Sequence, residues 1–426
     1  MLARDAYVWG LAVEFMNRFS RFQELVGAPR NTLNYGSDVA AWNNKASNAG
    51  DAAVLYINAI FDFNASGQKP LVLTVPPTTG QFYEANLLDN FVNGIGSIGN
   101  RTTPTTRSTS YLLVPPGSPW QHQKSVQLGG HTFPVLASDT NLNWLLIRIR
   151  ANALVPASDP SSLSSVNRSI VQKFAINSLQ EFRSNDHQPV YPKNYASPTP
   201  TAAEVQDSQQ WASAPTESLP FFQQMGESLV YSPLPPPNTG PSGTPIASVG
   251  PWCIPQSGAG DVYVMPAVGQ EPTLARFAPI GLTASGFKVP SNWGSRQMDA
   301  FNAGFRAGVR LVERAATAGK ANAGTNYWST LNSVIGTYPN TAEGYLTRSI
   351  VVLDGGSANV PLDAVYPTIT SNVMSGTQLD GNNTCSITFT QPQTSYPSSA
   401  WPDNHRRGWQ FHDSERTTSP TASLAA

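Results

Sequence analysis

The chain has 426 residues, enough for two or three domains at about 100 to 200 residues each. Charged residues make up 12% of it, against roughly a quarter in typical domains, whereas 33 Gly and 36 Pro favour β-structure with long polar turns. The 26 basic and 27 acidic residues nearly balance, no segment concentrates Lys or Arg, and no apolar stretch approaches the roughly 20 residues that cross a bilayer. These features argue against nucleic-acid binding, attraction to an anionic membrane and a membrane span.

The first half of the chain begins with a helical pattern and continues with strand patterns. Tyr7, Leu11, Phe15 and Phe19 have helical spacing and predict an amphipathic helix over residues 2–19. Short runs rich in β-branched and aromatic residues follow, divided by Pro and Gly turns, as in a sandwich or barrel. The expected strands are residues 54–63, 71–75, 82–88 and 111–114.

The second half alternates helices with polar connections. Asp159-Pro160-Ser161 predicts the start of a helix that runs toward Phe182, and a polar, Pro-rich surface segment should follow it. Further helices are expected at residues 219–230, where Pro233 stops the helix, and at 297–316. Gly, Pro and Ser make the stretch up to residue 269 the best linker. Strands are expected at 349–353 and 386–389.

Cys253 and Cys385 are the only two cysteines, and neither belongs to a Cys-x-x-Cys or Cys/His cluster. A thiolate zinc site is therefore not expected. They are either two buried free thiols or an oxidised pair in an exported protein. No charged region followed by an apolar run precedes Asp5, so an export signal was removed or never present.

Several motifs resemble a bacterial family called domain of unknown function 1254. The core of the resemblance runs from Tyr83 through residues 87–91, followed by Asn93 and residues 99–103. Residues 4–7 resemble the first helix of that family, and its next element is matched by Asp139-Thr140-Asn141 with Trp144 and Arg148. One departure matters: where the family has Asn-x-Asp-Thr before a tyrosine, this chain has Asp51-Ala52-Ala53-Val54-Leu55-Tyr56 and lacks a carboxylate.

Four later motifs resemble domain of unknown function 1214, which often follows the first family in one chain. They are residues 345–348, 358–361, 364–367 and 379–382. The resemblance implies an exported, periplasmic or extracellular protein of β-sandwich portions with packed helices, and it implies no agreed activity. We therefore expect a mainly β fold with packed helices (α+β), in which two β-sandwich-like domains are joined by a helical and Pro/Gly-rich middle. The expected units are a β-rich domain at 1–205, a helical and linker segment at 206–320 and a C-terminal β domain at 321–426.

Familiar catalytic and cofactor motifs are missing from the sequence. It contains no Gly-x-Ser-x-Gly turn for a serine hydrolase and no Walker loop, and Gly94-Ile95-Gly96 with Gly99 is followed by no helical pattern. His122, His131 and His187 could serve as bases, but each is isolated in the sequence and is expected on a surface or turn. The scattered histidines argue against a transition-metal site.

Oxygen ligands and arginines remain as candidate site residues. Asp89, Asn93 and Asn141 are the types of residue that bind a hard cation such as Ca²⁺, although the same residues commonly cap turns. Arg101 and Arg148 could pair with Asp89 or Asp62 inside the sandwich. Because an unpaired buried charge is too costly, Arg148 should be either buried with a carboxylate or exposed at a strand edge. Its replacement by alanine would then cost roughly 3 to 5 kcal/mol in the first case and about 0.5 kcal/mol or less in the second.

Two functions fit these residues. The first is a hydrolase of small esters or lactones assisted by Ca²⁺ or a carboxylate, with the following sites: catalytic Asp89, Arg148 and Tyr83, substrate-binding Tyr56, Arg101 and Trp144, and metal-binding Asp89, Asn93 and Asn141. The second is a non-catalytic envelope protein that is structural or binds glycans through aromatic rings. Most aromatic residues should belong to the core, Trp144 lies in an apolar run, and only Trp211 has a polar setting.

The last segment departs from the second family after Phe389. Residues 401–411 have neither strand alternation nor a helical face, whereas the same codons shifted by one base allow a Thr/Ile-rich strand like that of the family. This predicts an altered tail from about residue 390, produced by a frameshift. The second sandwich would lose its final strands, and the exposed sheet edge would invite self-association.

Overall fold

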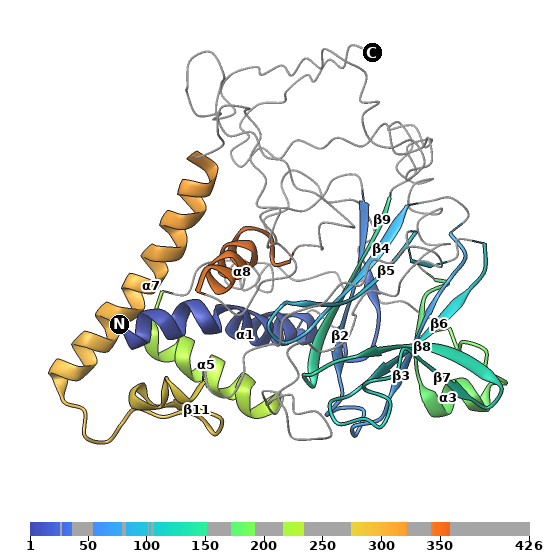
Figure 1. The fold of residues 1–426 in the computed structure, drawn as a ribbon, viewed down its shortest axis with the longest axis horizontal. Coiled ribbons are helices and arrows are strands. Elements are labelled where there is room, and N and C mark those ends of the chain that lie inside the picture. The colour runs from blue at the N-terminus through green and yellow to red at the C-terminus, as the bar shows by residue number, and fades with distance from the viewer. Residues whose placement is uncertain are drawn as a thin grey trace, which may run out of the picture.

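The computed structural model describes residues 1–25, 28–35, 54–78, 82–100, 102–103, 106–150, 172–191, 216–233, 274–321 and 342–357. In these residues a two-sheet β-sandwich lies beside a group of packed helices (Figure 1). The expected α+β fold, mainly β, is confirmed. None of the helices in the described ranges combines the length and apolar character that crossing a membrane requires.

The first sheet contains five antiparallel strands in the order β1-β2-β9-β4-β5. Their bounds are Asn34–Tyr35 (β1), Val54–Asp62 (β2), Leu142–Arg150 (β9), Tyr83–Leu88 (β4) and Gly94–Gly99 (β5). The central strand β9 aligns with β2 from Val54 opposite Arg150 to Asp62 opposite Leu142. Because side chains alternate along a strand, one face of this sheet points into the sandwich and the other points toward the helices.

The second sheet has the order β10-β3-β6-β8-β7, in which β6 and β8 are parallel and the other neighbours are antiparallel. The strands are Ala175–Ser178 (β10), Leu71–Val75 (β3), Thr109–Val114 (β6), His131–Ala137 (β8) and Ser125–Leu128 (β7). Buried side chains of both sheets form one apolar core between them, which includes Phe61, Leu73, Tyr111 and Ile147. The short helix α3 (Leu179–Ser184) covers a smaller core on the outer face of the second sheet.

The helical group is built around α1 (Leu2–Leu25), which packs against the helices α5 (Ser218–Tyr231), α7 (Ser295–Ala321) and α8 (Ala342–Gly355). A one-turn helix η1 (Ala278–Ile280) and a hairpin of β11 (Leu282–Thr283) and β12 (Gly286–Phe287) lie between α5 and α7 in sequence. Glycines allow the closest approaches: a Cβ on Gly10 would lie 1.8 Å from the sulfur of Met225, and one on Gly308 would lie 2.9 Å from Cβ of Tyr7.

Most of the expected elements within the described ranges are confirmed. The four expected strands and the helices at 2–19, 219–230 and 297–316 are present, with small shifts at their ends. The helix expected to run to Phe182 is wrong in its last part, because residues 175–178 form β10 and the helix α3 begins only at Leu179. Residues 151–171 lie outside the described residues.

A second correction concerns Ser349–Leu353, which lies in the helix α8 and not in a strand. The run is rich in β-branched residues, which favour strands when read alone. Packing against α1 overrides this local preference: the hydroxyl of Ser349 donates to the backbone oxygen of Val8, and Ile350 and Val352 are buried in the core around α1. The expected linker, both cysteines, Trp211, the strand at 386–389 and the altered tail lie outside the described residues.

Candidate functional site

The outer face of the first sheet is apolar at the end that the helices cover. There Ile60 of β2, Trp144 of β9 and Leu88 of β4 lie opposite one another across three strands. The rings of Phe15 and Phe19 on α1 pack on Trp144 with centroid distances of 6.2 and 4.5 Å. Trp144 is therefore a core residue, and its indole nitrogen donates to Asn58 Oδ1 at 3.0 Å.

Farther along the same face the side chains become polar. The next rung of the sheet is Asn58, Leu146 and Asn86, and the rung after it is Tyr56, Arg148 and Glu84. Residues directly opposite in an antiparallel pair share a face, with Cβ atoms about 5 Å apart. Tyr56, Arg148 and Glu84 thus form one row across β2, β9 and β4, which we call the polar row.

Charge and burial distinguish the polar row from an ordinary solvated surface. Glu84 is only 5% exposed, and Arg148 and Tyr56 are half-buried. The guanidinium carbon of Arg148 lies 5.9 Å from the centroid of the Tyr56 ring. A buried carboxylate is costly unless a cation or donors stabilise it, and Arg148 is the residue directly opposite Glu84. The polar row therefore places a carboxylate, a guanidinium that can stabilise its charge, and a phenol side by side.

A second polar group lies in the turn between β4 and β5. Asp89 is fully buried, and its Oδ1 accepts hydrogen bonds from the backbone nitrogens of Phe91 at 2.8 Å and Asn93 at 2.9 Å. Its Oδ2 accepts from Asn93 Nδ2 at 2.9 Å. Between them, Val92 has a φ of 60°, which is unusual for a β-branched residue. These bonds hold the turn in a strained conformation.

Helix α8 brings an arginine to this turn from 255 positions away in the sequence. Arg348 is 1% exposed, donates from Nη2 to Asn93 Oδ1 at 2.8 Å, and lies 4.8 Å from the ring centroid of Tyr345. Burial raises the pKa of Asp89 to about 6, although the donors from Asn93 and the charge of Arg348 oppose this rise. We call Asp89, Asn93 and Arg348 the joint, because they connect the sandwich to α8.

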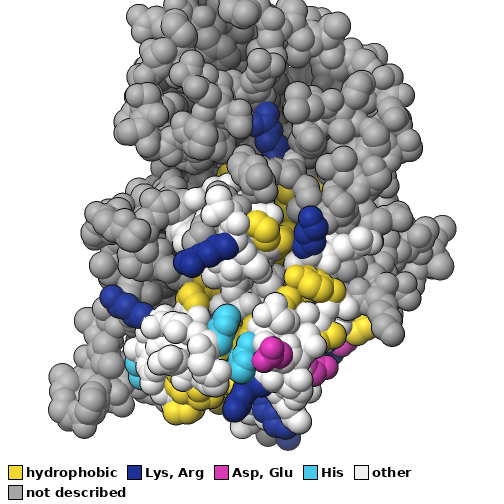
Figure 2. All heavy atoms as spheres, turned by 90° about the vertical axis from the view of Figure 1, so that its right-hand side faces the viewer, with side chains coloured by type: hydrophobic (Ala, Val, Ile, Leu, Met, Phe, Trp, Pro, Cys, Tyr) yellow, Lys and Arg dark blue, Asp and Glu magenta, His cyan; other side chains and the backbone are white. Residues whose placement is uncertain are grey.

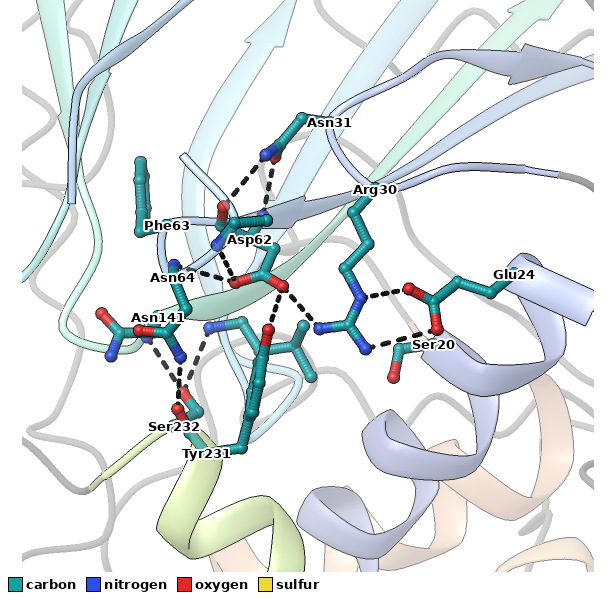
Figure 3. Close-up of polar contacts among 12 residues, drawn as sticks. Ser20, Glu24, Arg30, Asn31, Asp62, Phe63, Asn64, Asn141, Tyr231 and Ser232 are labelled. Carbon is teal, nitrogen blue, oxygen red and sulfur yellow. Dashed lines mark hydrogen bonds and ion pairs between the residues drawn. The ribbon is translucent and has the colours of Figure 1, made fainter. Parts of the chain in front are cut away.

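A third polar group surrounds Asp62 at the end of β2 (Figure 3). Its carboxylate accepts hydrogen bonds from Arg30 Nη1 and the hydroxyl of Tyr231, both at 2.5 Å, and from the backbone nitrogens of Asn64 and Ala65 at 2.9 and 3.2 Å. Arg30 also pairs with Glu24. Since Asp62 is fully buried and has four donors, this group anchors α1 and α5 to the sandwich.

The three expected catalytic residues do not converge. Asp89 lies in the joint and Arg148 in the polar row. Tyr83 instead points into the sandwich, where it is 1% exposed and its ring centroid lies 6.3 Å from that of Phe174. Of the expected substrate-binding residues, the structure brings Tyr56 to Arg148 and buries Trp144 under α1. Arg101 lies outside the described residues.

The expected calcium ligands are also separated. Asn93 is next to Asp89, but its Nδ2 donates to that carboxylate and its Oδ1 accepts from the cationic Arg348. The side chain of Asn141 instead accepts from Gln68 Nε2 at 3.2 Å. A cation at Asp89 and Asn93 would have to displace a guanidinium, so these residues do not fit a Ca²⁺ site. The described part of the chain contains no group of three or more His, Cys, Asp or Glu suited to a metal.

The arginine partners differ from those expected. Asp62 pairs with Arg30, and the arginine whose charge lowers the pKa of Asp89 is Arg348. The strand-edge alternative for Arg148 is wrong, because β9 is the central strand of its sheet. Sequence reasoning missed Glu84 and Arg348, although Glu84 directly follows Tyr83 and Arg348 is the last residue of the motif at 345–348.

Comparison with known proteins gives a family of unknown function and no activity. No curated protein sequence matches the chain. Among solved structures, the chain is similar to the crystal structure of the VPA0106 protein from Vibrio parahaemolyticus, with 16% identity, a TM-score of 0.49, and coverage of 89% of this chain and 73% of that one. Residues 30–177, which include the polar row, Asp62, Asp89 and Asn93, match the family described as Protein of unknown function (DUF1254).

Proposed function

We propose that this protein is a carboxylate-assisted hydrolase of small esters or lactones and that the polar row is its catalytic centre. The observation that carries the proposal is the alignment of Glu84, Arg148 and Tyr56 across three neighbouring strands. Pairing in a sheet fixes these side chains on one face without help from a loop, which gives the positional precision that catalysis requires.

Each member of the row has a defined role in this proposal. Glu84 accepts a proton from water as the water oxygen attacks the carbonyl carbon of the substrate, and Arg148 stabilises the negative charge that develops on the carbonyl oxygen. The bond to the leaving alcohol then breaks, and the alkoxide takes the proton from Glu84. Tyr56 holds the acyl part of the substrate through its ring and hydroxyl. The mechanism needs no metal ion.

The alternative is a non-catalytic exported envelope protein. The joint supports it, because both oxygens of Asp89 are occupied by donors and the group then serves only to fasten α8 to the sandwich. For the glycan-binding version of this alternative the described residues offer less, since Trp144 is buried under Phe15 and Phe19. Periplasmic or extracellular location is part of both proposals.

The test is hydrolysis of a panel of chromogenic esters and lactones by the purified full chain. Glu84→Gln keeps the size of the side chain but cannot accept the proton, so kcat should fall by roughly 10²- to 10⁴-fold. Arg148→Lys keeps the charge but not the planar guanidinium, and we expect kcat to fall by about 10²-fold. Glu24→Gln, a change in an exposed carboxylate outside the row, is the control and should leave kcat unchanged.

The result separates the two functions. Activity that depends on Glu84 and Arg148 supports the polar row, and activity that survives Glu84→Gln places the site elsewhere. A protein that hydrolyses no member of the panel, while circular dichroism shows it to be folded, favours the envelope component.

A further inference from the structure

Two histidines that are far apart in the sequence meet on the second sheet. His131 begins β8 and His187 follows α3, and their rings are parallel within 4° with centroids 6.2 Å apart. Figure 2 shows two histidine side chains side by side on the face of the molecule that carries this sheet. The aromatic rings of Phe133 and Phe182 pack against them, with centroid distances to His131 of 4.4 and 5.5 Å.

The backbone is strained where it presents His187. Asp186 and His187 have φ angles of 52° and 57°, a left-handed conformation that is unfavourable for residues with a side chain. Gly129, in the turn between β7 and β8, makes room for the ring: a Cβ there would lie 2.5 Å from His187 Nε2. Two separate features of the chain thus place His187 over this hairpin.

The ring of His187 packs on that of His131 with one nitrogen closed in. Its Nε2 is buried and has no hydrogen-bond partner among the described residues. Burial and the neighbouring His187 lower the pKa of His131, so the contact favours the neutral ring of His131.

The pair joins two elements that cover an apolar core. Phe182 on α3 is fully buried against Phe133 on β8, and Val114 and Leu112 of β6 belong to the same core. We call α3 with the following turn, residues 179–187, the lid. If the lid separates from the hairpin of β7 and β8, this apolar surface becomes exposed to water.

We propose that the stacked rings of His131 and His187 form an acid-sensitive latch, which holds the lid on the second sheet while His131 is neutral and releases it when His131 is protonated. This inference is independent of the proposed hydrolase, whose row lies on the other sheet.

Few other charges act on the latch. The strand β7 carries no titratable side chain, and the charged residues of the lid are Glu181, Arg183 and Asp186. Glu181 is engaged in capping α3, where its carboxylate accepts from the backbone nitrogen and hydroxyl of Ser178. Among the described residues, His187 is the titratable neighbour that lowers the pKa of His131, and no carboxylate there opposes this effect.

The sign of the pH effect follows from the lowered pKa. An unfolded or released His131 takes a proton near its ordinary pKa of 6.5, whereas the latched form resists it. The latched state therefore holds fewer protons, so the latch is fully effective above about pH 6.5 and weakens as the pH falls below that value.

Hydrogen exchange of the full-length protein tests the latch. The amide of His187 donates to the backbone oxygen of Phe182 at 3.0 Å, and its opening constant is the measured exchange rate divided by the intrinsic rate at the same pH. Between about pH 7.5 and about pH 5 we expect this constant to rise several-fold, because the latched form of His131 resists protonation. Amides of the central strand β9 serve as the internal reference and should show no such rise.

Two variants and a control make the outcome decisive. His187→Asn keeps a residue type that tolerates the left-handed conformation, and His131→Gln keeps a polar side chain, but neither titrates in this range. Both variants should lose most of the pH-dependent rise, and His122→Gln, which changes a histidine outside the pair, should retain it. The latch is refuted if the constant of the wild-type protein does not change with pH, or if both latch variants show the same rise as the wild type.

Discussion

Replacement of Asp62 by alanine should be among the most destabilising single changes in the sandwich. The carboxylate is fully buried and accepts hydrogen bonds from Arg30, Tyr231 and two backbone nitrogens of the following turn. These donors come from the segment after α1, from the end of α5 and from the turn between β2 and β3. Its loss would therefore loosen three attachments at once (Figure 3).

The magnitude can be worked out from the partners that remain. Removing one member of a buried ion pair costs about 3 to 5 kcal/mol, because the other charge stays buried without compensation. Arg30 keeps its second carboxylate, Glu24, and is 19% exposed, which places the expected loss near the lower end of this range. The hydroxyl of Tyr231 also loses its acceptor; burial and the Asp62 contact raise the pKa of Tyr231 to about 12 in the intact group. We expect the free energy of unfolding to fall by about 3 kcal/mol.

Urea unfolding followed by circular dichroism measures this loss, and the slope of the transition should not change between variants. Glu24→Ala is the matched control, since it removes the other carboxylate of the same arginine from a site that is 44% exposed. An exposed pair contributes about 0 to 1 kcal/mol, so the control should remain close to the wild type. If Asp62→Ala costs no more than Glu24→Ala, Asp62 does not anchor the helices as argued.

Four further results are expected. Burial raises the pKa of Asp89 to about 6, so the folded state holds this proton more tightly than the unfolded chain does. The free energy of unfolding of the wild type should therefore fall by about 3 kcal/mol as the pH rises from about 4 to about 6. In urea titrations Asp89→Asn should remove this fall. Arg148→Ala should cost roughly 2 to 3 kcal/mol in the same assay, less than for a fully buried pair, because Arg148 is half-buried above the buried Glu84. Gly308→Ala should lower the free energy of unfolding by about 1 to 3 kcal/mol, since the added Cβ would lie 2.9 Å from Cβ of Tyr7. An unchanged midpoint of the urea transition would contradict the tight packing of α1 on α7. A chelator should leave the melting temperature unchanged, and a clear decrease would indicate a native-state metal that Asp89 and Asn93 cannot explain.

The fold could be predicted from the sequence where one local signal decided the structure. The strands from Val54 to Val114 and the helix from Gln297 have clear alternation or helical spacing, and both appear where expected. Ser349–Leu353 was assigned wrongly because its β-branched residues dominate a short window, whereas its place in the structure depends on contacts with α1. Such contacts link residues more than 300 positions apart and leave no trace in local spacing.

In the candidate site, too, local signals in the sequence could be used, whereas long-range contacts could not. Arg148 and Tyr56 could be named because each is an unusual residue in an apolar strand, but their proximity depends on the register of β2 and β9. Glu84 could have been found by aligning the three strands as antiparallel neighbours, which puts it opposite Arg148. The histidine pair could not be found in this way, since it depends on the left-handed turn at Asp186 and His187.

The joint and the polar row are linked by the geometry of the first sheet. The joint fixes α8 through Arg348, and just beyond the end of this helix a Cβ on Gly356 would lie 3.4 Å from the Trp144 ring. Trp144 and Arg148 are four residues apart on one face of β9, a distance of about 14 Å along a strand. The end of α8 is therefore held at a set distance from Glu84 and Arg148, and a change in the joint would move this end of the helix relative to the row. For this reason a loss of activity after a change at Asp89 or Arg348 would not by itself make either of them catalytic, whereas loss in Glu84→Gln at unchanged stability would identify the group that exchanges the proton.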